Sequence, residues 1–379
     1  MEEFKIIATT NFGLEAVTKR ELQNIGYEDL EVSDGRIELR GTLRDICKLN
    51  LSLRTAERIF MVVDSFKAES FEELFEKVYA IDWTDFLKED SNFILQARSH
   101  KSKLFSLSDI QRISEKAIIK KLQNKYKRDW FSKVGERVKI EISILEDIAT
   151  VSIDTSGEGL HKRGYREVNY KAPISETIAA GLVMLSYWKD TRPLADPFCG
   201  SGTIVIEAAM IGKNIAPGLM RKFDFENFIF MPEDIYKEEK KNCYEKIAYD
   251  KKLDIEASDI SYKAIEIAKR NAEILDLDRD INFFQKDIRD LNLADNYGVI
   301  ITNPPYGERL AKNEAPILNK ELGKLYKSIP TWSLYAITAS ESFQKDFGKM
   351  ADRKRKLYNG KIKTYYFQYY GPRPFVNKK

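Results

Sequence analysis

The sequence predicts a mixed α/β protein, with a doubly wound parallel sheet in the C-terminal half and smaller α+β units before it. Three observations lead to this fold class. A strand, a glycine turn and a buried helix follow one another from Pro193 to Met210. Further apolar strands that end in Asp or Asn alternate with helical segments downstream. The chain has 379 residues, more than one usual core holds, so two or three domains are expected.

The first unit, residues 1–65, has the element order βαββαβ, which is typical of a ferredoxin-like domain. Gly26 ends its first helix, and Ser33-Asp34-Gly35-Arg36 marks a hairpin turn between two short strands. The other expected elements are a strand at Phe4–Thr10, helices at Gly13–Ile25 and Leu43–Leu53, and a strand at Arg58–Val63.

The second unit, residues 66–158, contains a basic helix. Its expected elements are helices at Phe71–Tyr79 and from about Ser108, and strands at Phe93–Arg98, Val138–Leu145 and Ala149–Ile153. On the second helix Arg112, Lys116 and Lys120 are four residues apart and share one face. Such a face predicts phosphate contact, and a solvated surface is the alternative reading.

A basic segment, Leu160-His161-Lys162-Arg163-Gly164-Tyr165-Arg166, lies in a linker that we place at residues 159–171. The C-terminal domain, residues 172–379, then opens with the segment Ala172-Pro173-Ile174 and a helix capped by Ser175. From Asn214 to Asp250 an insertion interrupts the domain, and its Glu238-Glu239-Lys240-Lys241 run predicts an exposed helix.

The loop Asp196-Pro197-Phe198-Cys199-Gly200-Ser201-Gly202-Thr203 is the main candidate ligand site. Its glycines let the backbone approach a ligand, and the helix that follows offers free N–H groups. The Lys of a phosphate-binding loop and the third Gly of a dinucleotide fingerprint are absent. Asp196 suits a cationic group, such as the ammonium of an amino acid, and this points to S-adenosylmethionine. The expected contacts are Asp196, Pro197, Phe198, Gly200, Gly202 and Thr203, and an ordinary glycine turn is the alternative.

A second polar strand end, Asn303-Pro304-Pro305-Tyr306, follows the apolar run Val299–Ile301. The side chain of Asn offers an acceptor oxygen, and two prolines hold a rigid extended turn. Together with the Pro304 carbonyl, Asn303 could therefore accept both hydrogens of one exocyclic amino group. Tyr306 offers a flat face on which a base can stack. A proline turn capped by Asn is the alternative.

The remaining expected elements complete the C-terminal sheet. Asp259 ends the strand Ile255–Asp259, where a carboxylate can accept ribose hydroxyls. Ser261 caps a helix to about Ile274, and Ile281–Phe284 is a strand that leads to Asp287. A fifth strand is expected at Trp332–Thr338, and a hairpin at Arg355–Lys363 around Asn359-Gly360.

These motifs resemble the amino-directed S-adenosylmethionine-dependent methyltransferases. The loop from Asp196 to Thr203 and the longer run Asn303-Pro304-Pro305-Tyr306-Gly307-Glu308-Arg309-Leu310 are similar to the bacterial THUMP-domain enzymes that modify a guanine amino group (N2) of 23S ribosomal RNA, formerly described as N6-adenine-specific DNA methylases. The resemblance implies a Rossmann-like class I methyltransferase sheet with an antiparallel terminal hairpin, preceded by ferredoxin-like and THUMP domains.

The resemblance also assigns roles to single residues. Asp287 would accept from the adenine amino group, and Asn303 would border both the cofactor and the target base. Contacts to RNA, from 23S ribosomal RNA or a ribosome assembly intermediate, are expected from the basic helix and the linker, namely Arg112, Lys116, Lys120, Lys162, Arg163 and Arg166.

Composition excludes several other classes of protein. With two histidines and three dispersed cysteines, a metal cluster, a Ser-His-Asp triad or a disulfide framework is not expected. No apolar run reaches the length of a membrane span and no signal peptide is evident, so we expect a cytoplasmic protein. Three alternatives stay open: an N6-adenine methyltransferase acting on DNA or RNA, a guanine-N2 methyltransferase acting on tRNA, and a non-catalytic RNA-binding assembly factor.

Overall fold

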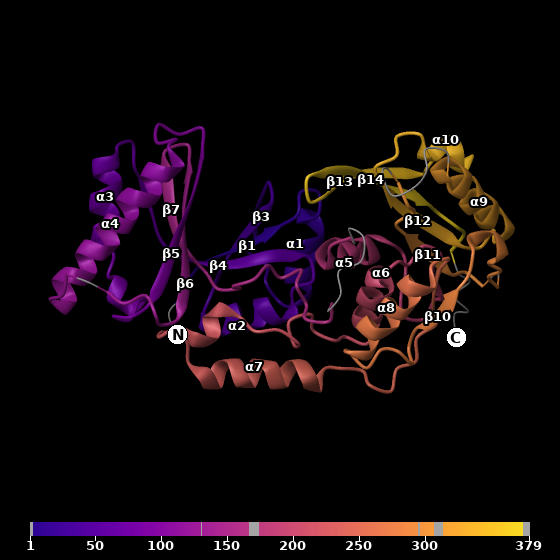
Figure 1. Cartoon of the computed structure of the whole chain (residues 1–379), viewed down its shortest axis with the longest axis horizontal. Helices are drawn as coiled ribbons and strands as arrows, with labels where there is room; N and C mark the ends of the chain where they lie inside the picture. The colour runs from indigo at the N-terminus through magenta and orange to yellow at the C-terminus, as the bar shows by residue number, and fades with distance from the viewer. Residues whose placement is uncertain (1–2, 130, 167–173, 295, 307–313, 374–379) are drawn as a thin grey trace.

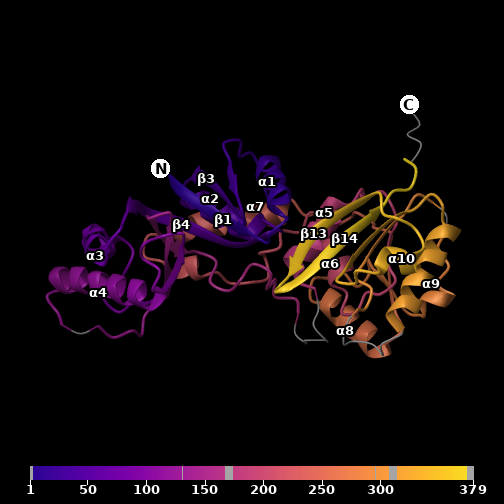
Figure 2. The same cartoon turned by 90° about the horizontal axis from the view of Figure 1, so that it is seen from above.

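Two seven-stranded sheets, one in each half of the chain, organise the computed structural model (Figure 1). The structure describes residues 3–129, 131–166, 174–294, 296–306 and 314–373. Figures 1 and 2 show an elongated molecule, with helices α3 and α4 at one end and the C-terminal sheet at the other. The strands β1 to β4 lie between these ends.

The N-terminal sheet has the strand order β2-β3-β1-β4-β7-β6-β5. Neighbouring strands are antiparallel except β5 and β6, which are parallel. Its strands are β1 (Phe4–Thr10), β2 (Glu31–Ser33), β3 (Arg36–Gly41), β4 (Ala56–Lys67), β5 (Asn92–His100), β6 (Arg137–Leu145) and β7 (Ile148–Asp154). The first four strands, with the helices between them, follow the predicted ferredoxin-like order.

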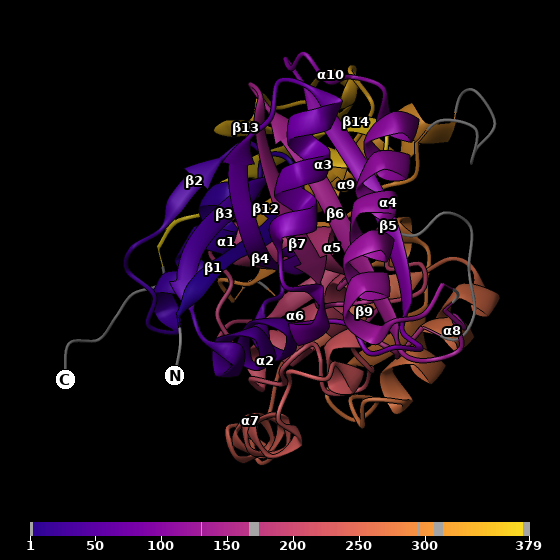
Figure 3. The ribbon, with the colours of Figure 1, turned by 90° about the vertical axis from the view of Figure 1, so that its left-hand side faces the viewer.

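Helices cover this sheet, and their starts follow from local sequence. Thr42 with Asp45, and Ser70 with Glu73, form capping boxes that satisfy free N–H groups at two helix starts. The helices are α1 (Glu15–Asn24), α2 (Leu43–Ser52), α3 (Phe71–Ala80) and α4 (Leu107–Tyr126), with a short 3₁₀ turn, η1, at Trp83–Asp85. Viewed from the N-terminal end, α3 and α4 lie side by side in front of β5, β6 and β7 (Figure 3).

Strand β4 belongs to both N-terminal units. It pairs with β1 over Ala56–Met61 and with β7 over Phe60–Lys67. The predicted division between residues 65 and 66 therefore falls inside a continuous strand. The strand was predicted to end at Val63, whereas pairing with β7 carries it on to Lys67.

The C-terminal sheet has the strand order β10-β9-β8-β11-β12-β14-β13. Five strands are parallel, and β14 and β13 form the predicted antiparallel terminal hairpin. The strands are β8 (Leu194–Asp196), β9 (Ile255–Asp259), β10 (Asn282–Gln285), β11 (Val299–Thr302), β12 (Ser333–Thr338), β13 (Arg353–Asn359) and β14 (Ile362–Tyr369).

Helices cover both faces of this sheet, as expected for a doubly wound fold. One apolar core joins the sheet to α5 (Glu176–Leu185), α6 (Thr203–Gly212) and α8 (Tyr262–Glu273). The other joins it to α9 (Glu314–Ser328) and α10 (Phe343–Phe347). The predicted caps form, because the hydroxyl oxygens of Ser175 and Ser261 accept from the N–H groups of Ile178 and Ala264.

The insertion between α6 and β9 leaves the C-terminal half and packs on the N-terminal core. It contains a 3₁₀ turn, η2 (Asp224–Asn227), and helix α7 (Glu233–Glu245), which contacts α2. Buried residues of the insertion that join the N-terminal core are Ala216, Leu219, Phe223, Phe225, Phe228, Met231, Tyr236 and Cys243.

The exposed helix predicted for the insertion is only half right, because one face of α7 is buried. Glu239 is 8% exposed, and it pairs with Arg44 of α2 at 2.6 Å. Charged side chains on the other face of α7, such as those of Lys237 and Lys241, lie in solvent as predicted.

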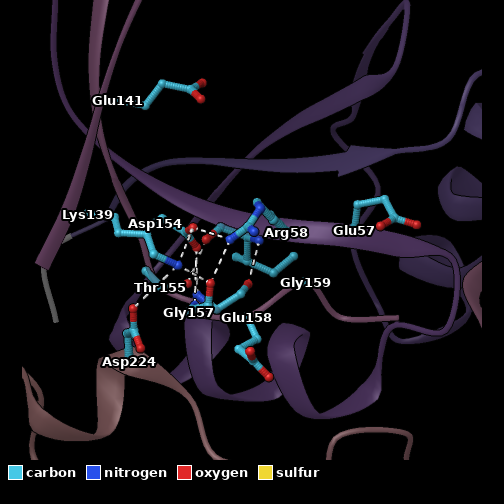
Figure 4. Close-up of polar contacts among 12 residues, drawn as sticks. Glu57, Arg58, Lys139, Glu141, Asp154, Thr155, Gly157, Glu158, Gly159 and Asp224 are labelled. Atoms are coloured by element: carbon cyan, nitrogen blue, oxygen red, sulfur yellow. Dashed lines mark hydrogen bonds and ion pairs between the residues drawn. The ribbon is translucent and has the colours of Figure 1, made fainter. Parts of the chain in front are cut away.

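A buried polar cluster joins the insertion to the N-terminal sheet (Figure 4). Arg58 of β4 donates to Asp154 of β7. Lys139 of β6 lies 3.9 Å from the Asp154 carboxylate and 3.8 Å from that of Asp224 in η2. Burial lowers the pKa of Lys139, and the two carboxylates oppose that shift. Four elements are therefore connected by ion pairs whose central side chains, those of Lys139 and Asp154, are 8% and 5% exposed.

No helix of the described residues is long and apolar enough to cross a membrane. Cys47, Cys199 and Cys243 are buried free thiols.

Candidate active site

A cavity of about 540 Å³ lies at the carboxyl ends of β8, β9 and β11. This is where open parallel sheets usually bind ligands. The cavity gathers residues from the two motifs that the sequence analysis singled out, although about 100 residues separate them in the chain. Its lining includes Asp196, Pro197, Phe198, Gly200, Thr203, Asp259, Asp287, Asn303 and Pro305.

Asp196 is the most deeply buried carboxylate of the cavity, at 2% exposed. Its Oδ1 accepts from the Thr302 hydroxyl at 2.6 Å and from the Phe198 N–H at 3.1 Å. Burial nevertheless raises the pKa of Asp196 to about 7, because these two hydrogen bonds only partly offset the loss of hydration. A buried carboxylate of this kind is well suited to pair with a cation.

The glycine loop is held in place by Asp259 at the end of β9. The Asp259 carboxylate accepts from the N–H of Gly200 at 3.0 Å and from the N–H of Ser261 at 2.9 Å. Gly200 has a φ of +53°, and a Cβ added there would meet no atom within 4 Å. Gly200 therefore presents bare backbone to the cavity.

Gly202, the other predicted glycine contact, starts the helix that follows the loop. It is absent from the cavity lining, and its φ is +82° at the start of α6. A Cβ added there would lie 3.0 Å from the Cβ of Ala268. Its lack of a side chain therefore lets α6 pack closely against α8.

Asp287 lines the cavity with both carboxylate oxygens already engaged. Its Oδ1 accepts from the Arg289 backbone N–H and Nε, each at 2.9 Å, and its Oδ2 accepts from Nη2. The hydrogen bonds from Arg289 lower the pKa of Asp287. The expected contact with an adenine amino group would thus share the carboxylate with Arg289.

Two apolar residues that the sequence analysis missed follow the acidic strand ends. Ile260 is 64% exposed although it is apolar, and Ile288 is 5% exposed. Both line the cavity, directly after Asp259 and Asp287. An apolar residue next to an acidic strand end could have been noticed in the sequence, because it offers a surface for a flat ring beside polar acceptors.

The Asn303 turn contributes an unsatisfied acceptor. The Asn303 Oδ1 atom is buried, and it accepts no hydrogen bond from the described residues. A buried acceptor without a donor costs free energy, so such an atom in a cavity suggests a ligand donor. Asn303 and Pro305 line the cavity, whereas Pro304 and Tyr306 do not. Tyr306 is only 9% exposed, and Gly307 to Leu310 of the extended motif lie outside the described residues.

Residues 163–368 match the family described as the RMKL-like methyltransferase domain. The chain belongs to this family. Residues 5–60 match the RlmL ferredoxin-like domain, and residues 68–154 match the THUMP domain. Both N-terminal assignments agree with the predicted domain types.

Two relatives align along nearly the whole chain. "Putative RNA methyltransferase YpsC" of Bacillus subtilis (strain 168) is 46% identical over 98% of this chain and 97% of its own. The ribosomal RNA large subunit methyltransferase K/L of Buchnera aphidicola (subsp. Acyrthosiphon pisum, strain APS) is 31% identical over 94% of this chain. The chain spans 53% of that longer enzyme.

Solved structures agree with this assignment. SMU.472, described as "a putative methyltransferase complexed with SAH" (S-adenosylhomocysteine), has a TM-score of 0.91 at 43% identity, covering 99% of this chain and 100% of that one. A protein described as a predicted N6-adenine-specific DNA methylase from Listeria monocytogenes has a TM-score of 0.93 at 45% identity, covering 98% of this chain and 97% of that one. The cofactor of this RMKL-like methyltransferase is therefore S-adenosylmethionine. The buried Asp196 carboxylate, the bare Gly200 backbone and the unpaired Asn303 Oδ1 fit such a ligand.

Of the three linker residues from which RNA contacts were predicted, Arg163 and Arg166 are largely buried. Arg163 is 2% exposed, and its Nε lies 3.3 Å from the buried Glu207 carboxylate of α6. Its Nη1 and Nη2 donate to the carbonyls of Leu160 and Arg54. The structure therefore does not support RNA contact by Arg163. Arg163 links Glu207 of α6 to the backbone of Arg54, just before β4.

Arg166 is also committed to protein partners. Its Nη2 donates to the Thr203 hydroxyl at 2.8 Å, and its Nη1 lies 3.3 Å from Glu176. Its side chain is only 15% exposed, and its contact with Thr203 holds the end of the glycine loop. Lys162 is the exposed member of the predicted set, although its ammonium pairs with Glu158 at 2.8 Å.

The predicted basic face of α4 exists. Arg112, Lys116 and Lys120 are exposed on one side of the helix. Arg112 pairs with Asp109, and Lys120 lies over the rings of Phe75 and Tyr79. Helix α4, which bears this face, lies at the opposite end of the molecule from the C-terminal sheet (Figure 1).

Proposed function

We propose that this methyltransferase transfers the methyl group of S-adenosylmethionine to the exocyclic amino group, N2, of a guanine in 23S ribosomal RNA. The observation that carries the proposal is the buried, unpaired Oδ1 of Asn303 in the cavity that holds Asp196 and Asp259. An RNA substrate is supported by the THUMP match and by the names of the Bacillus and Buchnera relatives.

The residues around the cavity divide between the parts of the cofactor. In our proposal Asp196 pairs with the ammonium of the methionine part, and Asp259 accepts from the ribose hydroxyls. Ile260 and Ile288 pack against the adenine ring, while Asp287 and the loop around Gly200 complete its surroundings. The bound cofactor supplies a methyl group on a positively charged sulfur, which makes that methyl group electrophilic.

The Asn303 turn prepares the target amino group. The lone pair of a guanine amino nitrogen is delocalised into the ring, so it is a poor nucleophile until its hydrogens are held. The Asn303 Oδ1 and the Pro304 carbonyl accept these two hydrogens and favour a localised lone pair on nitrogen. Asn303 is uncharged at neutral pH and cannot remove a proton, so its contribution is orientation, a kind of effect that can supply roughly 7–11 kcal/mol. Once the amino nitrogen has gained the methyl group it carries an extra proton, which then leaves to water.

The target base must leave its helix or already be unpaired, because the amino group has to reach the end of a buried strand. Tyr306 is the residue we expect to stack on that base. Since Tyr306 is 9% exposed, entry of the base requires the Asn303–Tyr306 turn to open. Pro305 lines the cavity and would border the base on its other side.

RNA affinity is the expected contribution of the N-terminal half. We propose that Arg112, Lys116 and Lys120 of α4, with the exposed Lys162, contact phosphates of ribosomal RNA or of a ribosome assembly intermediate. Such a substrate would be met in the cytoplasm. Charge reversal at Lys116 and Lys120 should then lower RNA affinity and reduce its dependence on salt.

Adenine N6 is the second candidate target, because the name of the Listeria protein describes an adenine methylase and the Asn303 turn suits either amino group. The decisive experiment supplies labelled S-adenosylmethionine and the full-length protein to RNA from a strain that lacks its gene. The digested nucleosides are then identified by mass spectrometry. N2-methylguanosine in 23S RNA is the expected product.

Asn303→Ala provides the matched variant for this experiment. It should lower the rate of methyl transfer far more than it changes cofactor affinity, because the lost contact is to the target. Methyladenosine as the only product would overturn the guanine assignment and leave the role of Asn303 intact. Full activity of Asn303→Ala would overturn that role.

A further inference from the structure

The terminal hairpin, formed by β13 and β14, is strongly basic, whereas the chain as a whole is nearly neutral. Between Arg353 and Tyr370 there are six basic residues and no acidic residue, whereas the full sequence has a net charge of only +3. The rest of the chain is therefore net negative. The basic residues are Arg353, Lys354, Arg355, Lys356, Lys361 and Lys363.

This charge is not neutralised within the described parts of the chain. None of the six basic side chains forms a salt bridge there, although exposed lysines and arginines elsewhere often do. On the face that bears Arg355, burial and the neighbouring charges of Arg353 and Arg20 lower its pKa. The charge of Glu341 contributes to raising the pKa of Lys363, after the larger effect of the Tyr365 hydroxyl. Uncompensated like charges of this kind favour a polyanionic partner.

Three lysines and two tyrosines form an ordered row on one face of the hairpin. Cross-strand pairing sets Lys356 opposite Tyr365 and Tyr358 opposite Lys363, while Lys354 lies next to them opposite Phe367. The Lys354 ammonium lies 3.7 Å from the centre of the Tyr365 ring, Lys363 lies 5.2 Å from it, and Lys356 lies 5.1 Å from that of Tyr358. Cation–π contacts therefore hold the ammonium groups over the sheet, which reduces the entropy they would lose on binding phosphates.

Strand register places this row beside the catalytic edge of the sheet. Thr302, which precedes Asn303, is opposite Ala336; Ala336 is opposite Phe367, and Phe367 is opposite Lys354. Lys356, Lys363 and the hairpin turn thus project past the strand end that carries Asn303. With strands about 4.8 Å apart, β13 lies roughly 14 Å from β11.

The row lies on the same face of the sheet as α9, a helix that also contributes to the cavity lining. The even-numbered residues of β13 share the face that packs through Phe367 onto α10. Helix α9 covers the same face, and its residues Glu314 and Ile317 line the cavity. In Figures 1 and 2 the hairpin reaches from the C-terminal sheet toward the N-terminal half, where Tyr358 meets Phe12.

We propose that Lys354, Lys356 and Lys363 hold the RNA backbone beside the nucleotide that enters the cavity. The proposal rests on the RNA substrate proposed above, and it adds a second phosphate-binding surface to that of α4. The α4 face lies at the far end of the molecule (Figure 1), so it can contact only RNA remote from the methylated base. The hairpin row is the positive surface next to the chemistry.

The test compares two triple variants of the full-length protein. The hairpin variant is Lys354→Gln, Lys356→Gln and Lys363→Gln. The control is Lys237→Gln, Lys241→Gln and Lys246→Gln, three exposed lysines of α7 and its end. Both variants lose the same total charge, and calorimetry with S-adenosylmethionine verifies that each still binds the cofactor as the native protein does.

The measured quantity is the slope of log K against log salt for a fluorescein-labelled oligouridylate. Losing three phosphate contacts on a single strand should reduce the magnitude of the slope by about 2, and affinity near physiological salt should fall on the order of tenfold to a hundredfold. The α7 control should keep the native slope. An unchanged slope in the hairpin variant, or an equal loss in the control, would overturn the proposal.

The methylation assay separates this inference from the proposed function. If the native protein methylates 23S RNA and the hairpin variant keeps its salt slope, the function stands and the hairpin inference fails. If the native protein methylates no RNA but binds oligouridylate through the hairpin, the RNA surface stands and the proposed reaction fails. Absence of any binding by the native protein would overturn both.

Discussion

At the scale of single residues, Asp196 couples cofactor binding to a proton. The pKa of its carboxyl group is raised to about 7 by burial, from an ordinary value of 3.8. Ionisation of this group therefore costs the ligand-free protein stability as the pH rises from the ordinary pKa toward 7. An ammonium group placed beside the carboxylate would offset that cost, so binding favours the ionised form.

We expect the affinity for S-adenosylmethionine to fall as the pH drops below 7, by up to about tenfold per pH unit, and to level off above it. Calorimetry across this range, repeated in buffers of different ionisation enthalpy, should detect release of a proton on binding below pH 7. The variant Asp196→Asn keeps an acceptor for Thr302, so it should bind more weakly and without this pH dependence. A native affinity that is flat across the range would contradict the assignment.

Asp259 and Asp287 provide a second comparison between single residues. Each carboxylate oxygen of Asp259 accepts one hydrogen bond, from Gly200 or from Ser261, whereas Asp287 accepts three from Arg289, so Asp259 keeps more acceptor capacity for ribose. Asp259→Ala should weaken cofactor binding by about 1–3 kcal/mol, because charge-assisted hydrogen bonds are lost. Asp287→Ala should cost less. Calorimetric titration of both variants measures the difference, and the reverse order would show that Asp287 is the stronger contact.

At the scale of elements, α6 is fastened to the N-terminal half by the buried pair of Arg163 and Glu207. Arg163→Met should destabilise the protein by about 3–5 kcal/mol, because the Glu207 carboxylate would remain buried without its cationic partner and with only the hydrogen bond from the Tyr165 hydroxyl. Chemical denaturation measures the loss, and the double variant Arg163→Met, Glu207→Gln should recover much of it. The salt dependence of RNA binding should not change. A stable Arg163→Met protein with a smaller salt slope would restore the RNA contact first predicted for Arg163.

Local pattern was enough to predict most elements, because the signals of strand, turn and helix lie within a few residues. The glycine loop and the serine caps formed where the sequence placed them, and Asn303 follows β11 and lines the cavity. The predictions that failed depend on distant partners. Val63 was not the end of β4 because β7 pairs with the residues after it. Arg163 looked like a surface cation because its partner Glu207 lies 44 residues away in the chain.

Some missed features had a local signal. Ile235, Tyr236 and Cys243 are spaced so that they fall on one side of α7 and mark its packed face, which the neighbouring charge run obscured. Arg289 stands two residues after Asp287, close enough to pair with it. The unpaired Oδ1 of Asn303 had no such signal, since its isolation depends on how β8, β9 and β11 meet.

At the scale of the whole molecule, the insertion makes the two halves dependent on each other. A chain cut to residues 172–379 would expose Phe223, Phe225 and Phe228, which the N-terminal core normally covers. We expect such a fragment to aggregate and to bind hydrophobic dyes. The matched control replaces residues 215–247 with a short Gly-Ser loop. Such a loop can connect the two ends, because the Ala248 N–H donates to the Lys213 carbonyl at 2.9 Å.

That control fragment should aggregate less than the first and bind S-adenosylmethionine, because the cavity lies on β8, β9 and β11. Both fragments lack Arg163 and Tyr165, the partners of Glu207, so both carry Glu207→Gln and differ only in the insertion. Size-exclusion chromatography and calorimetry distinguish the outcomes. Equal behaviour of the two fragments would show that the insertion does not depend on the N-terminal half.

Because the insertion packs on the N-terminal core, it also affects the order in which the two halves can fold during synthesis. Domains near the N-terminus usually fold while the rest of a chain is still being made. Here the first core stays incomplete until Tyr236 and Cys243 have left the ribosome, by which point β8 and α6 have already emerged. The second sheet must in turn wait for β9, which follows the insertion. Segments of the two cores therefore emerge from the ribosome alternately. A nascent chain stalled before residue 220 would have both cores incomplete.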